Sequence, residues 1–177
     1  MPLVGAFPQS IRDDATVVAS AFDKFPAVDG FRVVVDGDTC EIPYRIDADA
    51  NCLTSLSPRQ VDLGNCLLTR HRNGFVRQEY LARIVLLKEP WVTPFVIQLL
   101  GEYVSEIIHV IDVNLALLDA SVYGQFLVRN PKFWNLTRGR VASYWDCYYR
   151  SIPRADYVGF QVVRWFDEQR KASSVLE

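Results

Sequence analysis

The sequence predicts a mainly α-helical protein, an antiparallel bundle of several helices with a small N-terminal β-hairpin. Two observations predict the helices: Ser57-Pro58 and Thr93-Pro94 each place a hydroxyl residue before a proline, as at the N-cap and first position of a helix. A third predicts the hairpin, because Asp36-Gly37 separates two short runs that favour strands. The composition is that of a globular protein, with half of the 177 residues apolar and 23% charged.

The first expected elements are a helix and the hairpin. Apolar residues recur at helical spacing from residue 10 to residue 25, and Pro26 follows them. The run FRVVVDGDTCEIPYRI, residues 31–46, then favours two strands joined at Asp36-Gly37. Pro43 lacks the N–H group that a central strand needs, so the second strand is expected at a sheet edge.

From Ser57 onward every element is expected to be a helix, and the first begins with a capping-box sequence. The expected helices are 57–71, 75–88, a long helix from Thr93 to as far as Leu118, 121–129, 137–150 and 155–171. No low-complexity linker separates them, so one domain is expected over residues 1–177. Residues 1–50 would form a helix-and-hairpin subregion, and residues 57–171 the bundle.

The stretch TRHRNGFVRQE, residues 69–79, gathers four basic side chains around an Asn-Gly pair. Residues 70–72 are expected in the last turn of a helix, where cations meet the negative end of the helix dipole. Gly74 is then expected to close that helix in the left-handed conformation. Binding of a partner is the alternative interpretation, for which Arg72 and Arg77 are the candidate residues.

Residues 74–85, GFVRQEYLARIV, resemble the second helix of a HEAT-type repeat, which often opens with Val-Arg and continues with spaced apolar residues. The resemblance covers twelve residues and implies a short HEAT-like stack of helices as one form of the bundle. A similar triplet, Pro-Trp-Val, follows after sixteen residues, whereas such repeats run at about 40 residues or more. An antiparallel bundle is therefore the main expectation.

Several bulk features favour a cytoplasmic protein that does not span a membrane. The N-terminus lacks the basic and apolar regions of a secretion signal, and charged residues interrupt the most apolar segment. The four cysteines, at positions 40, 52, 66 and 147, form no CxxC pair and are expected to be reduced. Charge is distributed unevenly along the sequence. Residues 29–62 contain seven acidic residues and three arginines, whereas residues 129–171 contain nine basic and four acidic residues.

A polar stripe is expected along the long helix. Its members step by three and four residues and would share one helix face: Gln98, Glu102, Ser105, Glu106, His109 and Asp112. Glu106 and His109 have the Glu-x-x-His spacing of di-iron bundles, but the second such pair is missing. No metal or cofactor is therefore expected. A solvated helix face explains the stripe, and a surface for a basic partner is its functional interpretation.

The functional expectation is a non-catalytic protein-interaction module, such as an inhibitor, an adaptor or an immunity-type protein, because no common catalytic motif occurs. Its candidate partner-binding residues are Glu102, Glu106, His109, Asp112, Arg72 and Arg77. The first alternative is an enzyme with an acidic cleft centred on His109. An enzyme would show His109 in a concave pocket with convergent polar groups, whereas an interaction module would show a flat or convex stripe.

The second alternative is a nucleic-acid binder that uses the aromatic and arginine residues of the C-terminal third. Such residues can stack on bases and clamp a single strand. However, Tyr144, Trp145, Tyr148 and Tyr149 have the spacing of a core-facing helix stripe, which favours core packing. A helix-turn-helix over residues 57–88 is disfavoured, because the chain lacks the basic surplus of such proteins.

Overall fold

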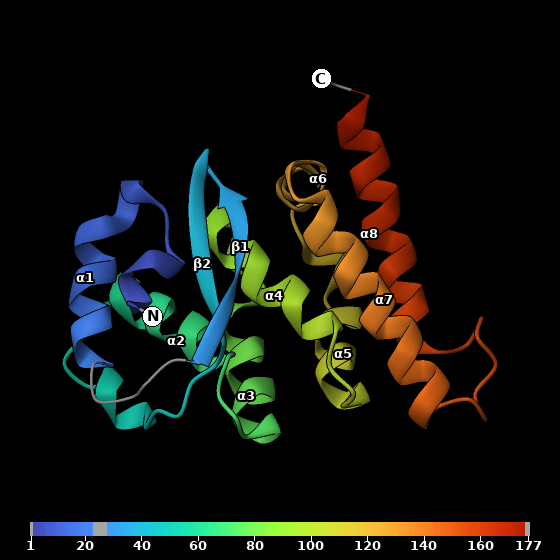
Figure 1. The fold of residues 1–177 in the computed structure, drawn as a ribbon, viewed down its shortest axis with the longest axis horizontal. Helices are drawn as coiled ribbons and strands as arrows, with labels where there is room; N and C mark the ends of the chain where they lie inside the picture. Colours follow the sequence, from blue (N-terminus) through green and yellow to red (C-terminus); the bar gives the residue numbers. More distant parts are fainter. Residues whose placement is uncertain (1, 23–27, 176–177) are drawn as a thin grey trace. The chain divides into compact units, whose positions relative to one another are not determined.

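The computed structural model describes residues 2–22 and 28–175 (Figure 1). In this part of the chain the protein is mainly helical, with one two-stranded antiparallel sheet near the N-terminus, so the predicted fold class is confirmed. The chain divides into two compact units, residues 1–84 (unit 1) and residues 85–177 (unit 2). The single domain expected from the sequence stays a prediction.

Unit 1 contains three helices and the hairpin within its described residues. These elements are α1 (Arg12–Ala21), β1 (Val28–Val35), β2 (Asp38–Arg45), α2 (Pro58–Leu68) and α3 (Gly74–Ile84). Short 3-10 turns occur at Leu3–Ala6, Gln9–Ile11 and Ala50–Leu53. The predicted first helix extended to residue 25, and its last part, together with Pro26, lies outside the described residues.

The hairpin turns at the predicted position. Asp36 and Gly37 both have positive φ, 51° and 87°, as a two-residue turn requires. Cys40 and Ile42 of β2 are fully buried, which follows from the alternation of faces along a strand. Because the sheet has only two strands in the described residues, each strand is an edge strand, and Pro43 is accommodated as predicted.

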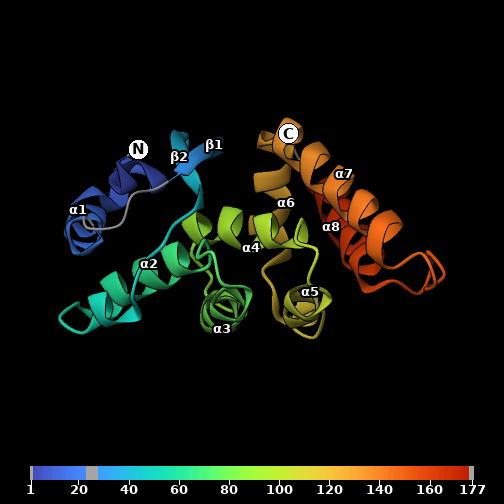
Figure 2. The same ribbon diagram turned by 60° about the horizontal axis from the view of Figure 1, so that its bottom comes forward.

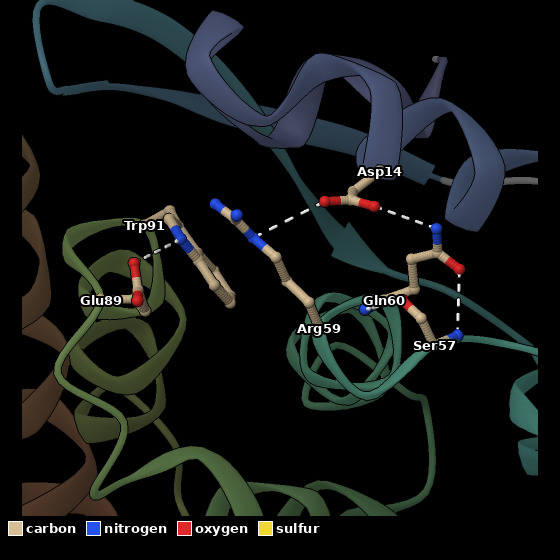
Figure 3. A network of polar contacts seen from close by, with 6 residues as sticks. All are labelled: Asp14, Ser57, Arg59, Gln60, Glu89 and Trp91. Atoms are coloured by element: carbon tan, nitrogen blue, oxygen red, sulfur yellow. Dashed lines mark hydrogen bonds and ion pairs between the residues drawn. The ribbon is translucent and has the colours of Figure 1, made fainter.

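The predicted capping box starts α2. The Ser57 hydroxyl accepts a hydrogen bond from the Gln60 N–H (3.4 Å), and the Gln60 side-chain oxygen accepts one from the Ser57 N–H (3.1 Å). The Gln60 amide also donates to the Asp14 carboxylate of α1 at 2.9 Å, and Arg59 lies 3.6 Å from the same carboxylate (Figure 3). These contacts fix the start of α2 against α1.

The prediction for the end of α2 is wrong in two respects. The helix ends at Leu68, before the basic residues that were expected in its last turn. Gly74 is not left-handed, since Gly37 is the glycine with positive φ in the described residues. Instead, Gly74 is the first residue of α3, and the Asn73 side chain accepts the Phe75 N–H at 2.9 Å. The Asn-Gly pair therefore starts a helix, because asparagine is also a favoured N-cap residue.

Unit 2 is helical throughout its described elements. They are α4 (Thr93–Leu100), α5 (Ser105–Asp112), α6 (Ala120–Arg129), α7 (Pro131–Tyr148) and α8 (Val158–Ser174), with 3-10 turns at Pro90–Val92 and Leu115–Leu117. Helix α8 packs against α5, α6 and α7, and α4 packs against α5, α6 and α7 (Figure 2). Within residues 2–22 and 28–175, no helix has the length and hydrophobicity that a bilayer crossing requires.

The long helix predicted from Thr93 is wrong, because the chain forms two helices, α4 and α5, with a break between them. Gly101 leaves the helical conformation with ψ of 29°, and Val104 is extended before α5 begins. Thr93 is the first residue of α4 rather than its N-cap. Every residue of α4 is buried, which fits its mostly apolar sequence TPFVIQLL.

Helix α7 begins earlier than predicted. Residues 130–136 were left between two expected helices, but Pro131 occupies the first turn of α7. Its fixed φ suits that position, and its missing N–H would have no partner within the helix there. A proline thus marks the start of the helix instead of a gap.

Candidate functional site

The basic candidates Arg72 and Arg77 belong to the loop and helix that follow α2 in unit 1. Arg77 is only 3% exposed, and its guanidinium donates hydrogen bonds to the carbonyl oxygens of His71 (2.9 Å) and Arg72 (2.8 Å). The Arg72 N–H donates to the Ile46 carbonyl at 3.1 Å, while its side chain is exposed. Arg77 therefore holds the loop in place, and of the two candidates only Arg72 offers its side chain to solvent.

Sequence reasoning missed the role of Arg70, which is fully buried. Its guanidinium donates to the carbonyl oxygens of Pro43 (3.3 Å), Tyr44 (3.1 Å) and Thr69 (3.3 Å), which links β2 to the end of α2. The available signal was the apolar run just before it, Cys66-Leu67-Leu68, which continues a buried face. A buried arginine surrounded by carbonyl oxygens has a structural role.

The predicted polar stripe does not form one continuous surface in the structure. Gln98 and Glu102 are each 4% exposed, so neither contributes to an open face. The other members lie on α5, where Glu106 and His109 are exposed. The Nδ1 atom of His109 lies 3.7 Å from a carboxylate oxygen of Asp112. Of the predicted stripe, only the members on α5 are therefore accessible.

A pocket of about 280 Å³, the α5 pocket, lies beside this helix. It is lined by residues of α5, by the start of α8 and by the segment between α7 and α8: Ser105, Glu106, His109, Tyr149, Ile152, Asp156, Tyr157 and Val158. Glu106 and Asp156, two acidic residues, are both part of the pocket lining. Sequence reasoning found Glu106 and His109 but missed Asp156, which no spacing rule connects with α5.

Two stacked tyrosines, Tyr149 and Tyr157, line the α5 pocket, with ring centroids 5.2 Å apart and an interplanar angle of 26°. The Tyr149 hydroxyl donates to the Tyr103 carbonyl (2.8 Å) and accepts from the Ser105 N–H (3.3 Å), which attaches the end of α7 to the start of α5. Tyr157 is 1% exposed, and its hydroxyl has no hydrogen-bond partner among the described residues. Burial, and then the neighbouring Tyr149, raises the pKa of Tyr157 to about 12.

The geometry around His109 bears on the enzyme alternative. His109 lines the α5 pocket beside other polar groups, as that alternative predicts, but its side chain is 66% exposed, as on an open binding surface. The Ser105 hydroxyl, however, donates to Glu106 at 3.2 Å, and the His109 ring faces Asp112. The structure therefore does not join Ser105 to the His109 imidazole as a serine–histidine pair.

The aromatic residues of the C-terminal third divide between core and surface. The buried face of α7 consists of Phe133, Trp134, Thr137 and Val141. Tyr148 is 64% exposed, so the prediction that residues 144–149 form a core stripe is wrong. The tyrosines at 144 and 148 instead form a cluster with Tyr103, with ring centroids 5.9 to 6.1 Å apart.

Comparison with known proteins identifies no relative of this chain: no protein-family model matches it, and neither does any curated protein or any solved structure. The resemblance of residues 74–85 to a HEAT-type repeat stays a prediction. In the described part of the chain, no three His, Cys, Asp or Glu side chains are arranged to hold a metal ion. The α5 pocket is therefore the candidate functional site of unit 2.

Proposed function

We propose that the protein is a non-catalytic interaction module that binds a basic segment of another protein at the α5 pocket. The observation that carries this proposal is the meeting of two carboxylates, Glu106 and Asp156, and two tyrosine rings in one pocket. Carboxylates form charge-assisted hydrogen bonds with ammonium and guanidinium groups, and the face of an aromatic ring attracts the same cations.

The size and walls of the α5 pocket fit a single basic side chain. Its volume of about 280 Å³ lies just below the range of roughly 300–1,000 Å³ that is usual for small-molecule sites. Ile152 and Val158 offer apolar surface to the methylene stem of a lysine, while the carboxylates meet its ammonium group. Asp112, beside His109, adds a further negative charge to the same helix.

Peptides with a single central lysine, and the same peptides acetylated at that lysine, test the proposal by fluorescence anisotropy. The wild-type protein is expected to bind the unmodified peptides more tightly, and the affinity should fall as the salt concentration rises. Glu106→Gln and Asp156→Asn remove charge at nearly constant shape. Together they should weaken binding of the lysine peptides about tenfold or more, which corresponds to about 1.4 kcal/mol.

Glu168→Gln provides the matched control for Glu106→Gln, because Glu168 is an exposed carboxylate of α8 that does not line the pocket. It should leave peptide binding unchanged. Circular dichroism should show that all variants retain the wild-type helix content. Equal binding of lysine and acetyl-lysine peptides, or an equal loss in the control, would reject the proposal.

An enzyme that uses His109 as an acid–base group is the second candidate, favoured by the position of His109 at the α5 pocket. A panel of ester, phosphoester and glycoside substrates provides the test. Turnover that is lost in His109→Gln, while helix content is retained, would favour the enzyme over the interaction module.

A further inference from the structure

A second pocket, of about 390 Å³, is lined by residues of α7, of α8 and of the segment that connects them. Its charged lining groups are two arginines, Arg138 and Arg154, and among the residues that the structure describes no carboxylate lines it. We propose that this arginine pocket binds the phosphate group of a small organic phosphomonoester. The site is separate from the α5 pocket, which has different lining residues and the opposite charge.

Arg154 is positioned by aromatic rings instead of by an acid. Its guanidinium lies 4.5 Å from the ring centroid of Phe160 and 5.8 Å from that of Trp145. In the described part of the chain, its side chain forms no hydrogen bond or ion pair. Stacking on a ring orients the guanidinium plane and leaves its N–H groups available, and this planar fork matches the oxygen atoms of a phosphate.

Arg138 supplies the second cation from α7. One of its terminal nitrogens lies 3.6 Å from a carboxylate oxygen of Asp167, which also accepts a hydrogen bond from the Trp134 indole N–H at 2.8 Å. This contact orients Arg138 while it engages only part of a guanidinium that carries five N–H donors. Asn135, one turn earlier on the same helix, adds a side-chain amide to the pocket.

Gly139 leaves the surface of α7 open at the pocket. A Cβ atom added there would meet nothing within 4 Å, whereas at Gly159 it would lie 2.6 Å from the Tyr157 ring. Glycine inside a helix costs about 0.5–1 kcal/mol relative to alanine, and packing does not require it at residue 139. The open space lets a ligand approach the backbone of α7.

The apolar part of the lining indicates an organic phosphate rather than the inorganic ion. Ala142, Phe160 and Val163 line the same pocket as the arginines. A volume of about 390 Å³ leaves room for a carbon group beside the phosphate. The expected ligand therefore has one phosphate at the arginines and a small apolar body against Phe160 and Val163.

Calorimetric titration of the full chain with phenyl phosphate tests the proposal, with inorganic phosphate and phenol as comparison probes. Phenyl phosphate should bind more tightly than either, because only it uses both the arginines and the apolar lining. Arg154→Gln and Arg138→Gln should each weaken its binding about tenfold. Gly139→Leu should abolish binding with no loss of melting temperature, because leucine favours a helix and meets open space.

Arg164→Gln is the matched control, since Arg164 is an exposed arginine of α8 outside the pocket lining. It should leave phenyl phosphate binding unchanged. No binding by the wild type at millimolar concentration, or wild-type binding by Gly139→Leu, would overturn the proposal. A single-stranded oligonucleotide that binds more tightly than phenyl phosphate, and loses affinity in Arg164→Gln as well, would overturn it in favour of an extended nucleic-acid surface.

Discussion

At the scale of single residues, two glycines of unit 1 differ in their backbone conformation. Gly37 has φ of 87°, whereas Gly74 has no positive φ, and a Cβ atom there meets only the Arg77 side chain at an ordinary 3.6 Å. We expect Gly37→Ala to lower the free energy of unfolding by about 1–2 kcal/mol, because the left-handed region is strained for alanine. Gly74→Ala should leave it unchanged or raise it slightly. Urea denaturation measures both, and equal losses would contradict these conformations.

Because of Cys40, the free energy of unfolding is expected to fall as the pH rises in the alkaline range. Burial, and then the charges of Asp38 and Asp36, raises the pKa of its thiol from 9.0 to about 12. Between these pH values the unfolded chain loses the thiol proton while the folded chain keeps it. The stabilisation is therefore complete below about pH 9 and is lost as the pH rises towards 12, by about 1.4 kcal/mol per pH unit for this group.

Urea denaturation in reducing buffer between pH 8 and pH 10.5 checks this expectation. The midpoint should fall with rising pH in the wild type and fall less steeply in Cys40→Ala. Burial raises the pKa of Cys66 as well, so some of the slope should remain. Cys147→Ala serves as the control, because Cys147 is exposed, and it should retain the wild-type slope.

At the scale of elements, the packing of α6 on α8 requires a residue without a side chain. A Cβ atom added at Gly124 would lie 2.6 Å from the carbonyl oxygen of Gln169 and would also collide with the Ser173 hydroxyl. Gly124→Ala should therefore push the two helices apart and disturb the contact between Tyr123 and Phe166, whose ring centroids are 5.4 Å apart. The expected loss of stability is about 1–3 kcal/mol.

Thermal denaturation followed by circular dichroism measures this loss. Gly139→Ala is the control, since it makes the same change in α7 where the added atom meets nothing within 4 Å. It should keep or raise the melting temperature. If the two variants melt at the same temperature, the result would contradict a close approach of α6 and α8 at Gly124.

Elements were predictable where a local chemical signal marks their ends. The capping box at Ser57 and the Asp36-Gly37 turn are such signals, and both are confirmed. Gly101 is a helix-ending residue at the end of α4, but this signal was missed because apolar residues resume beyond Glu102. A Cβ atom at Gly101 would lie 3.1 Å from the Arg140 side chain, so packing against another helix shapes the chain there. Such a contact cannot be predicted from spacing.

At the scale of the whole molecule, the fold class could be predicted from the sequence, but the set of residues that line the α5 pocket could not. Glu106 and Asp156 are fifty residues apart, and only the packing of α5 with α8 brings their segments together. Glu102 shows the converse, since its spacing suggested an exposed stripe but it lies in the buried break after α4. Helical periodicity describes one continuous helix and fails where the helix ends.

The division into two units has a consequence for spectroscopy. All four tryptophans lie within residues 85–177, whereas three of the four cysteines lie within residues 1–84. Tryptophan fluorescence therefore reports on unit 2, and the reactivity of the buried thiols of Cys40 and Cys66 reports on unit 1. If the chain is one domain, both signals should change at the same urea concentration. Two separate midpoints would reveal two bodies that unfold independently, each with its own natural probe and without any added label.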